Sequence, residues 1–532
     1  MPNTRQPEYK PLLYTTTVRN PERVKYFLYA LKQFDGQVLT NEIATQVVAE
    51  TIRLGLYRPR YKTEEIKRKW RSTPNGVFAD EILSDEEVAY IIEHNPQQHK
   101  EAGFDWGFPS RFATMFDFTK ELGLVYFQPN ESIEFSELGT KLSETFEVTI
   151  TDGTINVEIV HPEYEQQVFL QAMAKSQRKN PFVRVLNDNI PLILLAQTIR
   201  LLNANPNFNT ADGCGKGISR RELPLLIFWK DNNADSLYQR IVQLREEYGY
   251  EPSDEVIYDI CTREIIPNFK EFKLKSVIDE YPDEFIRKMR ITGLFSLRGA
   301  GRFLDINHNE EEKVDYVLQH YSTYQTYTTE REYFDYMAQI DPNLFQIETT
   351  PISTTQSEEL LMNWLNVYSW DDIKKELKVL KSRNNSKDMV LRFIPAPARL
   401  EFLTALSIKS RLPNVRVIPN YASDDTGLPT STAGGNIGDV ECIEQLKGIL
   451  VEVTMSEGRT QTMMEIWPIE RHLQEFADKI NLQSQAIFVA PSIFSDSQRQ
   501  IEFVKATKGL TIRPYTINDF ISYLDNPTRL YA

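Results

Sequence analysis

The feature that most constrains the fold is a pair of short apolar segments near the C-terminus, each of which contains an acidic residue. Residues 438–441 read Gly-Asp-Val-Glu, and residues 448–454 read Gly-Ile-Leu-Val-Glu-Val-Thr. The uninterrupted apolar run 449–451 predicts a strand that is buried on both faces. Asp439 then begins one strand and Glu452 closes the next, so the two carboxylates are expected at adjacent strand ends.

Carboxylates held in this way are hard oxygen ligands of the kind that Mg²⁺ accepts. The backbone carbonyl of Val453, between Glu452 and Thr454, is the candidate for a third oxygen ligand. The pattern indicates a metal-dependent phosphodiesterase. Because 75 of the 532 residues are acidic, two acids at this spacing also occur by chance. On spacing alone, the segment is therefore more typical of a polar hairpin end. The surrounding elements must therefore decide between the two readings.

The flanking sequence predicts alternating helices and strands. Residues 398–406 have the apolar spacing of a helix and place Glu401 on one of its faces. Residues 460–479 predict a helix that is kinked near Pro468. The elements that follow are a strand at 486–490, a helix from Ser495, a strand at 510–513 and a last helix from Thr516. The predicted order is α-β-β-β-α-β-α-β, with the acidic residues on the second and third strands.

This order resembles the PD-(D/E)xK nuclease core. More closely, the run 437–472, which includes Glu465 and Arg471-His472, resembles the catalytic domain of the AlwI family of type IIS restriction endonucleases and nickases. Three other segments match the family, at residues 15–23, 177–182 and 217–224. The resemblance therefore extends over nearly the whole chain and is weakest from about residue 321 to 388.

The resemblance implies a type II endonuclease that binds a short asymmetric double-stranded DNA sequence. It implies Mg²⁺-dependent cleavage at a fixed short distance outside that sequence, with 5′-phosphate and 3′-hydroxyl ends, and a cognate DNA methyltransferase. In the wider superfamily a lysine stands where this chain has Thr454, and Arg459 is a nearby but weak substitute. The expected catalytic residues are Asp439, Glu452, Glu465, His472 and Glu401, and the expected metal ligands are Asp439, Glu452 and Val453.

Two of these acidic residues, Glu401 and Glu465, are candidates to hold a second ion or its waters, and His472 is a candidate to contact the phosphate or relay protons. Each of the three also has a plain structural interpretation. Only one Asp439/Glu452 pair occurs in the chain, so one bound chain is expected to nick a single strand. A double-strand break would need a transient homodimer or a separate nuclease subunit.

Length and composition predict a soluble protein with several domains. The 532 residues exceed what one hydrophobic core usually serves, and 41% hydrophobic with 25% charged residues is ordinary globular composition. Cys214, Cys261 and Cys442 are far apart and odd in number, which argues against a disulfide framework and a cysteine zinc site. Because there is no signal sequence and no apolar run of membrane-spanning length, we expect a cytoplasmic protein with no membrane segment.

The formal net charge of −15 argues against a nonspecific nucleic-acid coat protein. Basic residues nevertheless gather locally, in residues 53–71, 175–179 and 287–302. Such runs are usually solvated helix faces. An acidic surface with basic grooves would favour selective DNA binding over general adhesion.

Two segments have the helix–hairpin–helix outline of a winged-helix module. The first comprises a helix at 112–122, strands at 124–127 and 132–135, and a helix at 138–142. The second begins with a capping box of Ser219 and Glu222 and ends with a hairpin whose Gly299-Ala300-Gly301 tip lies between two arginines. Such a tip can be a solvated turn, but beside this outline it favours DNA contact. The expected DNA-binding residues are Arg298, Arg302, Arg220, Arg221, Arg178 and Lys179.

The sequence as a whole predicts a multidomain α+β protein with a helical N-terminal region and a C-terminal α/β PD-(D/E)xK core. The expected divisions are two DNA-recognition subdomains with winged-helix modules at 1–150 and 151–320, a helical linker at 321–386 that includes a lysine-bearing helix at 358–381, and the nuclease domain at 387–532. Two alternatives stay open: a strand-specific nicking subunit, and a non-catalytic winged-helix regulator that would have no use for converging acids. The glycine-rich segment 213–217 lacks a phosphate-loop spacing and predicts a flexible turn.

Overall fold

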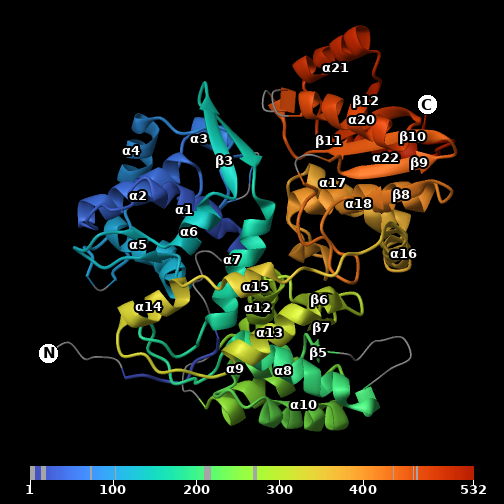
Figure 1. Ribbon diagram of the computed structural model, residues 1–532. Helices are drawn as coiled ribbons and strands as arrows, with labels where there is room; N and C mark the ends of the chain where they lie inside the picture. The colour runs from blue at the N-terminus through green and yellow to red at the C-terminus, as the bar shows by residue number, and fades with distance from the viewer. Residues whose placement is uncertain are drawn as a thin grey trace. The chain divides into compact units, whose positions relative to one another are not determined.

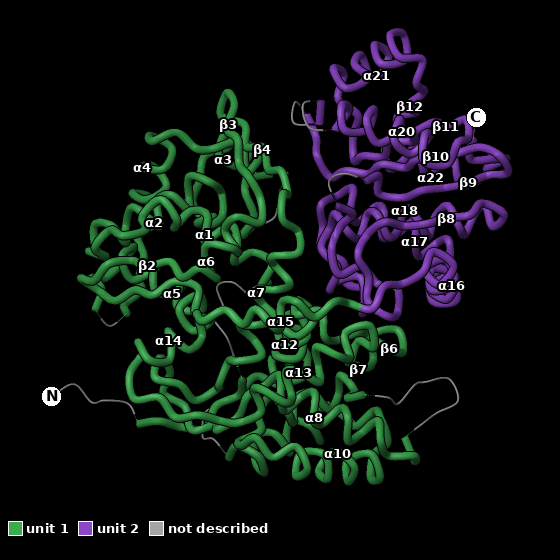
Figure 2. Tube along the Cα trace, viewed as in Figure 1, with its two compact units in different colours: residues 1–349 green, residues 350–532 purple. Residues whose placement is uncertain are grey.

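The computed structural model describes residues 6–12, 20–71, 73, 75–101, 103–208, 217–267, 272–434, 437–458, 461–462 and 465–531. The chain divides into two units, Met1–Thr349 and Thr350–Ala532, shown in green and purple in Figure 2. The division falls inside the segment 321–386 that the sequence analysis assigns to a linker. Residues 15–19 of the family-like opening, the predicted turn up to Lys216, Cys214 and Arg459 lie outside the described residues.

Unit 2 is built around a five-stranded sheet with the strand order β12-β11-β10-β9-β8. Strands β8, β9 and β10 are antiparallel neighbours, whereas β11 and β12 continue the sheet in parallel with β10. The chain order is α18 (Ala396–Arg411), β8 (Arg416–Pro419), β9 (Val440–Glu444), β10 (Lys447–Val453), α20 (Ile466–Ile480), β11 (Gln483–Ala490), α21 (Ser495–Lys508), β12 (Ile512–Thr516) and α22 (Ile517–Asp525). This confirms the predicted α-β-β-β-α-β-α-β order.

The central strand β10 is covered on both faces, as its unbroken apolar sequence predicts. Ile449, Leu450 and Val451 are each at most 1% exposed. On one face, Leu450 belongs to a core with residues of α20 and α21, such as Leu473 and Val504. On the other face, α18 packs on β8 and β10, and both α17 (Trp370–Lys381) and α22 pack on α18, as Figure 1 shows for the orange and red part of the chain. This packing fixes the sheet edge at which Glu452 lies.

Two predicted helices of unit 2 have wrong boundaries. The single helix expected from residue 358 to 381 is instead α16 (Thr354–Trp364) and α17 (Trp370–Lys381). The break occurs because Ser369 and Asp372 form a capping box that starts a new helix. The helix expected at 460–479 is interrupted at Glu465, and α20 starts at Ile466. Pro468 therefore lies in a first turn, where its missing N–H breaks no hydrogen bond.

Unit 1 contains both predicted helix–hairpin–helix segments. The first consists of α5 (Phe108–Glu121), β1 (Val125–Tyr126), β2 (Glu134–Phe135) and α6 (Glu137–Ser143). In the second, Ser219 and Glu222 make the expected reciprocal hydrogen bonds, and a strand adds to the hairpin to give the order β5-β7-β6. Its elements are β5 (Ile218–Ser219), α9 (Leu223–Phe228), α10 (Ala234–Tyr248), α12 (Tyr281–Arg290), β6 (Phe295–Arg298) and β7 (Phe303–Ile306). The assignment of either segment to a winged helix remains a prediction.

The remaining elements of unit 1 are mostly helices. They are α1 (Val24–Lys32), α2 (Asn41–Arg53), α3 (Glu64–Trp70), α4 (Asp85–His94), β3 (Phe146–Thr151), β4 (Thr154–Ile159), α7 (Pro162–Lys175), α8 (Pro191–Ala204), α11 (Asp254–Asp259), α13 (Glu311–Tyr321), α14 (Glu330–Ala338) and α15 (Pro342–Gln346). Cys261 and Cys442 are both buried and free. Across the described ranges, none of the helices combines the length and the apolar character that crossing a membrane requires.

Candidate active site

The carboxylates of Asp439 and Glu452 lie at the same edge of the unit 2 sheet. Strands β9 and β10 run antiparallel and pair Val440 with Val451. Asp439, just before Val440, therefore lies opposite Glu452, just after Val451. The Val453 N–H donates to Asp439 Oδ2 at 2.7 Å. Glu452 is only 7% exposed. The structure therefore brings together the first two predicted metal ligands beside the backbone of the third.

Glu465 joins this edge from the segment that precedes α20. Its Oε1 accepts a hydrogen bond from the Thr454 hydroxyl at 2.6 Å. That hydroxyl also accepts from the Ser456 N–H at 3.0 Å. Thr454, the residue at the superfamily's lysine position, therefore fixes Glu465 and supplies no positive charge.

His472 and Glu401 reach the site from helices on opposite faces of the sheet. His472 on α20 is buried, and its Nδ1 lies 2.9 Å from Glu452 Oε1. Glu401 on α18 is 4% exposed, and its Oε2 accepts from the Ala433 N–H at 3.0 Å. The His472 contact orients Glu452, whereas Glu401 acts on the other acids through its charge.

Burial raises the pKa of all four carboxyl groups at this edge, and repulsion by neighbouring acids adds to the effect for Glu452, Glu401 and Asp439. For Glu452, burial and then the charge of Glu465 raise the pKa to about 8. For Glu401, burial and then Asp439 raise the pKa to about 9. The pKa of Asp439 lies well above its usual range because of burial and the neighbouring Glu452, and burial raises that of Glu465. Like charges gathered in a region of low polarity cannot all ionise without compensation.

The donor set at this edge fits a hard divalent cation. Asp439 and Glu401 accept hydrogen bonds from backbone N–H groups, Glu465 accepts from the Thr454 hydroxyl, and Glu452 contacts His472. In the parts of the chain that the structure describes, none of these four carboxyl groups is paired with Lys or Arg. A bound cation would supply the missing positive charge, and oxygen ligands suit Mg²⁺. No group of three or more His, Cys, Asp or Glu side chains in these ranges has a ready metal-binding arrangement, so a carbonyl or water oxygen would have to complete the shell.

Two residues outside the predicted catalytic and metal-binding set, Gly438 and Asn420, hold the backbone of this site. An added Cβ at Gly438 would lie 2.4 Å from Leu450 Cδ1 and 3.0 Å from Glu452 Oε1, so any larger residue there would displace Leu450. Asn420, just after β8, donates from its side chain to the Gly438 carbonyl at 2.7 Å and from its backbone to the Asp439 carbonyl at 2.9 Å. The glycine before Asp439 can be recognised in the sequence. The Asn420 contact cannot, because a long loop separates Asn420 from its partners.

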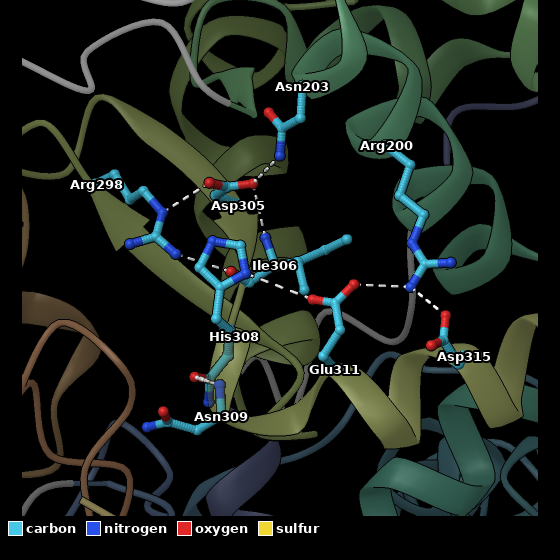
Figure 3. A network of polar contacts seen from close by, with 10 residues as sticks. Arg200, Asn203, Arg298, Asp305, Ile306, His308, Asn309, Glu311 and Asp315 are labelled. Carbon is cyan, nitrogen blue, oxygen red and sulfur yellow. Dashed lines mark hydrogen bonds and ion pairs between the residues drawn. The ribbon is translucent and has the colours of Figure 1, made fainter. Parts of the chain in front are cut away.

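The hairpin arginines of unit 1 occupy different environments. Figure 3 shows Arg298 turned back along its own hairpin, where its Nε donates to Asp305 Oδ2 at 2.7 Å and its Nη2 to the Ile306 carbonyl at 2.9 Å. The Asp305 side chain is fully buried and also accepts from Asn203 on α8 at 2.8 Å. Arg302, near the tip, is exposed. Arg298 therefore braces the hairpin, while Arg302 faces solvent.

The other predicted DNA-binding residues divide in the same way. Arg178 and Arg220 are buried, Arg178 donates to the Pro11 carbonyl at 3.0 Å, and burial lowers the pKa of Arg220. Arg221 is half-buried in an ion pair with Asp254. Lys179 is exposed and lies 3.1 Å from Asp188. Without rearrangement, Arg302, Lys179 and part of Arg221 are accessible to DNA, whereas Arg178 and Arg220 are not.

Half of the basic residues in the run 53–71 form ion pairs within unit 1. Arg53 pairs with Glu50 and Asp85. Arg68 pairs with Glu81 at 3.0 Å and Lys69 with Glu87 at 2.7 Å. This agrees with the interpretation of the run as solvated helix surface.

Comparison with known proteins decides the family. The model of the AlwI restriction endonuclease family matches residues 120–392 and 354–523. The chain belongs to the AlwI restriction endonuclease family. It is therefore a member of a family of DNA-binding nucleases, and the matched residues include the whole acidic edge of unit 2.

Several solved structures are similar to this AlwI-family chain. The small subunit of the heterodimeric restriction endonuclease R.BspD6I is 23% identical, with 29% of this chain and 76% of that chain covered and a TM-score of 0.25. The restriction endonuclease FokI is 10% identical, with 98% of this chain and 96% of that chain covered; the TM-score is 0.23 for FokI bound to DNA and 0.25 for a second FokI structure. No curated protein gives a significant match.

The Arg298–Asp305 pair predicts a stability difference between the two hairpin arginines. Arg298→Ala leaves a fully buried carboxylate without its cation, so the free energy of unfolding of unit 1 should fall by about 2–4 kcal/mol. Arg302→Ala at the exposed tip should change it by less than about 0.5 kcal/mol. Urea unfolding followed by circular dichroism measures both. Equal, small effects of the two variants would show that Asp305 does not depend on Arg298.

The raised pKa values predict how the stability of unit 2 depends on pH. Without divalent cations, Glu452 and Glu401 bind protons more tightly in the folded than in the unfolded state. Their contribution is therefore present below about pH 4.5 and is lost as pH rises through about 8 to 9. Calorimetry in EDTA should show the melting temperature falling over this range by roughly 5 °C, and excess Mg²⁺ should reduce the fall.

The matched variant for this measurement is Glu401→Gln/Glu452→Gln, which removes both titrations and keeps the side-chain sizes. Its melting temperature in EDTA should depend less on pH than that of the unmodified protein. A fall of the same size in the variant would assign the pH dependence to other groups.

Proposed function

We propose that this AlwI-family chain is a type IIS-like restriction endonuclease. Unit 1 would bind a short asymmetric DNA sequence, and unit 2 would hydrolyse phosphodiester bonds a fixed short distance outside it. The observation on which this rests is the convergence of Asp439, Glu452 and Glu465 at one edge of the unit 2 sheet. A merely structural hairpin end has no need for several buried carboxyl groups with raised pKa values.

The proposed roles follow from the contacts of each residue. Asp439, Glu452 and the Val453 carbonyl would hold Mg²⁺, which polarises the scissile phosphate and lowers the pKa of an attacking water. His472 acts as a positioning residue, because its Nδ1 fixes the Glu452 carboxylate. Glu465, fixed by Thr454, and Glu401 are placed to order waters at the edge of the site.

The proposed reaction is hydrolysis of one phosphodiester bond. The water oxygen forms the new bond to phosphorus, and the bond between phosphorus and the 3′ oxygen breaks. The 3′ oxygen takes up a proton and leaves as a hydroxyl, and the phosphate remains on the 5′ end. The water gives up its proton to the surrounding carboxyl groups or to solvent, so atoms and charge balance.

The wider organisation is part of the proposal. The strand order and the acid positions support assignment of the unit 2 sheet to the PD-(D/E)xK core. The helix–hairpin–helix segments of 1–150 and 151–320 support two recognition subdomains with winged-helix modules, with exposed Arg302 at one hairpin tip. A cognate DNA methyltransferase would protect host DNA, and the substrate implies cytoplasmic action. A non-catalytic regulator is disfavoured by the acidic cluster, whereas a strand-specific nicking subunit would share it.

The first prediction tests the acidic cluster. Asp439→Ala and Glu452→Ala should each abolish plasmid cleavage with Mg²⁺, because each removes a ligand, while DNA binding changes by no more than a few-fold. Asp478→Asn, an exposed acid on the same helix as His472, is the matched control and should cut normally. Ca²⁺ in place of Mg²⁺ should permit binding without cutting. Substantial cutting by either alanine variant would remove that residue from the site.

A second prediction concerns the number of chains per break. One acidic cluster hydrolyses one strand, so nicked circles of a one-site plasmid should accumulate at low enzyme concentration. Linear DNA should then form at a rate that rises more steeply than enzyme concentration, if a transient homodimer supplies the second cluster. Linear product that stays negligible at every concentration would favour the nicking subunit. Linearisation proportional to enzyme with no nicked intermediate would contradict the single-cluster account.

A further inference from the structure

Gln461 lies a few residues before Glu465, is 0% exposed, and joins two loops of unit 2 through its side chain. Its Nε2 donates to the Ser456 carbonyl at 3.1 Å, in the loop after β10, and to the Ser492 carbonyl at 2.8 Å, in the loop after β11. Its Oε1 accepts from the Phe494 N–H at 2.9 Å. The side-chain amide therefore uses both of its N–H donors and its carbonyl oxygen. The sequence analysis assigns this residue no role.

Gln461 also closes a ring of hydrogen bonds that contains Glu465. The Ser456 N–H donates to the Thr454 hydroxyl at 3.0 Å, and that hydroxyl donates to Glu465 Oε1 at 2.6 Å. The Glu465 N–H donates to the Gln461 carbonyl at 3.2 Å, and the Gln461 side chain leads back to Ser456. The ring therefore holds both the backbone and the carboxylate of Glu465.

The ring is attached to the central sheet at two points. The Thr454 N–H donates to the carbonyl of Val489 on β11 at 3.0 Å, and Val489 is 0% exposed. The Gln461 side chain binds Ser492 and Phe494, which follow the same strand. Because these partners belong to a close-packed core, the ring cannot shift as a unit without breaking contacts to the sheet.

The position of Glu465 matters because its charge acts on the predicted metal ligands. The carboxylate of Glu465 raises the pKa of Glu452 and of Asp439. Burial raises the pKa of Glu465 itself, and hydrogen bonds from the Thr454 and Ser456 side chains oppose that rise. Hydrogen bonds of this kind favour the ionised form. A displacement of Glu465 would therefore change the negative charge available at the sheet edge.

We propose that Gln461 is a positioning residue for hydrolysis, whose side-chain amide holds Glu465 at the acidic edge. The role requires an uncharged group that donates two hydrogen bonds and accepts one. A carboxylate would repel the two carbonyl oxygens, and a thioether would leave them without a donor. The inference rests on the proposed function in placing Glu465 at the site of hydrolysis.

The test variant is Gln461→Met, which keeps a side chain of similar length and removes all three hydrogen bonds. Its matched control is Gln485→Met on β11. Gln485 is 1% exposed, donates to the Leu530 carbonyl at 3.5 Å, and pairs with Ile449, toward the opposite end of β10 from Glu452. The control therefore removes a buried amide without touching the ring. Circular dichroism and urea unfolding establish that each variant is folded.

Cation binding to the full chain without DNA gives the first measurement. Mn²⁺ accepts the same oxygen ligands as Mg²⁺, and electron paramagnetic resonance measures how much of it is bound. Gln461→Met should weaken Mn²⁺ binding about tenfold, and Gln485→Met should leave it unchanged. Thr454→Val, which opens the ring at the carboxylate of Glu465, should also weaken it. An unchanged affinity in Gln461→Met, or a complete absence of Mn²⁺ binding by the unmodified protein, would overturn the proposal.

A double-mutant cycle separates positioning from a general loss of structure. If Gln461 acts through Glu465, Gln461→Met should weaken Mn²⁺ binding in the unmodified protein but not in a Glu465→Gln background. Equal losses in the two backgrounds would overturn the proposal, because they would show that Gln461 acts independently of Glu465.

Plasmid cleavage under single-turnover conditions gives a second readout. Gln461→Met should lower the maximal rate about 10- to 100-fold, while the enzyme concentration that gives half the maximal rate stays the same, because the buried amide cannot contact DNA. A higher half-maximal concentration with an unchanged maximal rate would overturn the proposal. If the unmodified protein bound Mn²⁺ but cut no plasmid, the proposed nuclease function would fail, and the Mn²⁺ measurements would still decide the role of Gln461.

Discussion

The mutual repulsion of carboxyl groups at the edge of β9 and β10 is the constraint on which the unit 2 site depends. Burial raises the pKa of all four carboxyl groups, and neighbouring acids raise the pKa of Asp439, Glu452 and Glu401 further. Folding that brings such groups together costs free energy. The divalent cation proposed above would offset this cost, because its positive charge would compensate the carboxylates.

The surrounding packing makes that arrangement rigid. Strand β10 is enclosed on both faces, so Glu452 cannot move away from Asp439 without disturbing the core. Gly438 lets the chain pass close to Leu450 and Glu452. The Thr454 hydroxyl and His472 then fix two of the carboxyl groups individually. Preorganisation of this kind lets a site act on developing charge without rearranging.

Much of unit 2 was predictable because its signals are local. The apolar run 449–451 predicted a strand covered on both faces, and the element order followed from periodicity and strand length. The break at residues 365–369 was missed, although the Ser369-x-x-Asp372 capping pair was a usable local signal. The roles of Asn420 and Thr454 were missed because their partners are set by folding, not by spacing.

In unit 1 the sequence predicted the hairpin but not the state of its arginines. Arg298 and Asp305 are diagonal neighbours across β6 and β7, since Arg298 pairs with Phe303 and Ser296 with Asp305. The register alone allowed this pair, but the burial of Asp305 by α8, which makes the contact strong, depends on tertiary packing. A pattern of basic residues therefore predicts a charged face less reliably than apolar periodicity predicts a strand.

The central claim is that the acids at this edge bind a divalent cation. Its most direct test is affinity cleavage with Fe²⁺, which accepts the same carboxylate ligands as Mg²⁺, in the presence of ascorbate and peroxide. Radicals formed at the bound iron should cut the polypeptide next to Asp439 and Glu452, and excess Mg²⁺ or Asp439→Asn should suppress both cuts. Cuts confined to other parts of the chain, or cuts at these positions that neither Mg²⁺ nor the variant suppresses, would contradict the account.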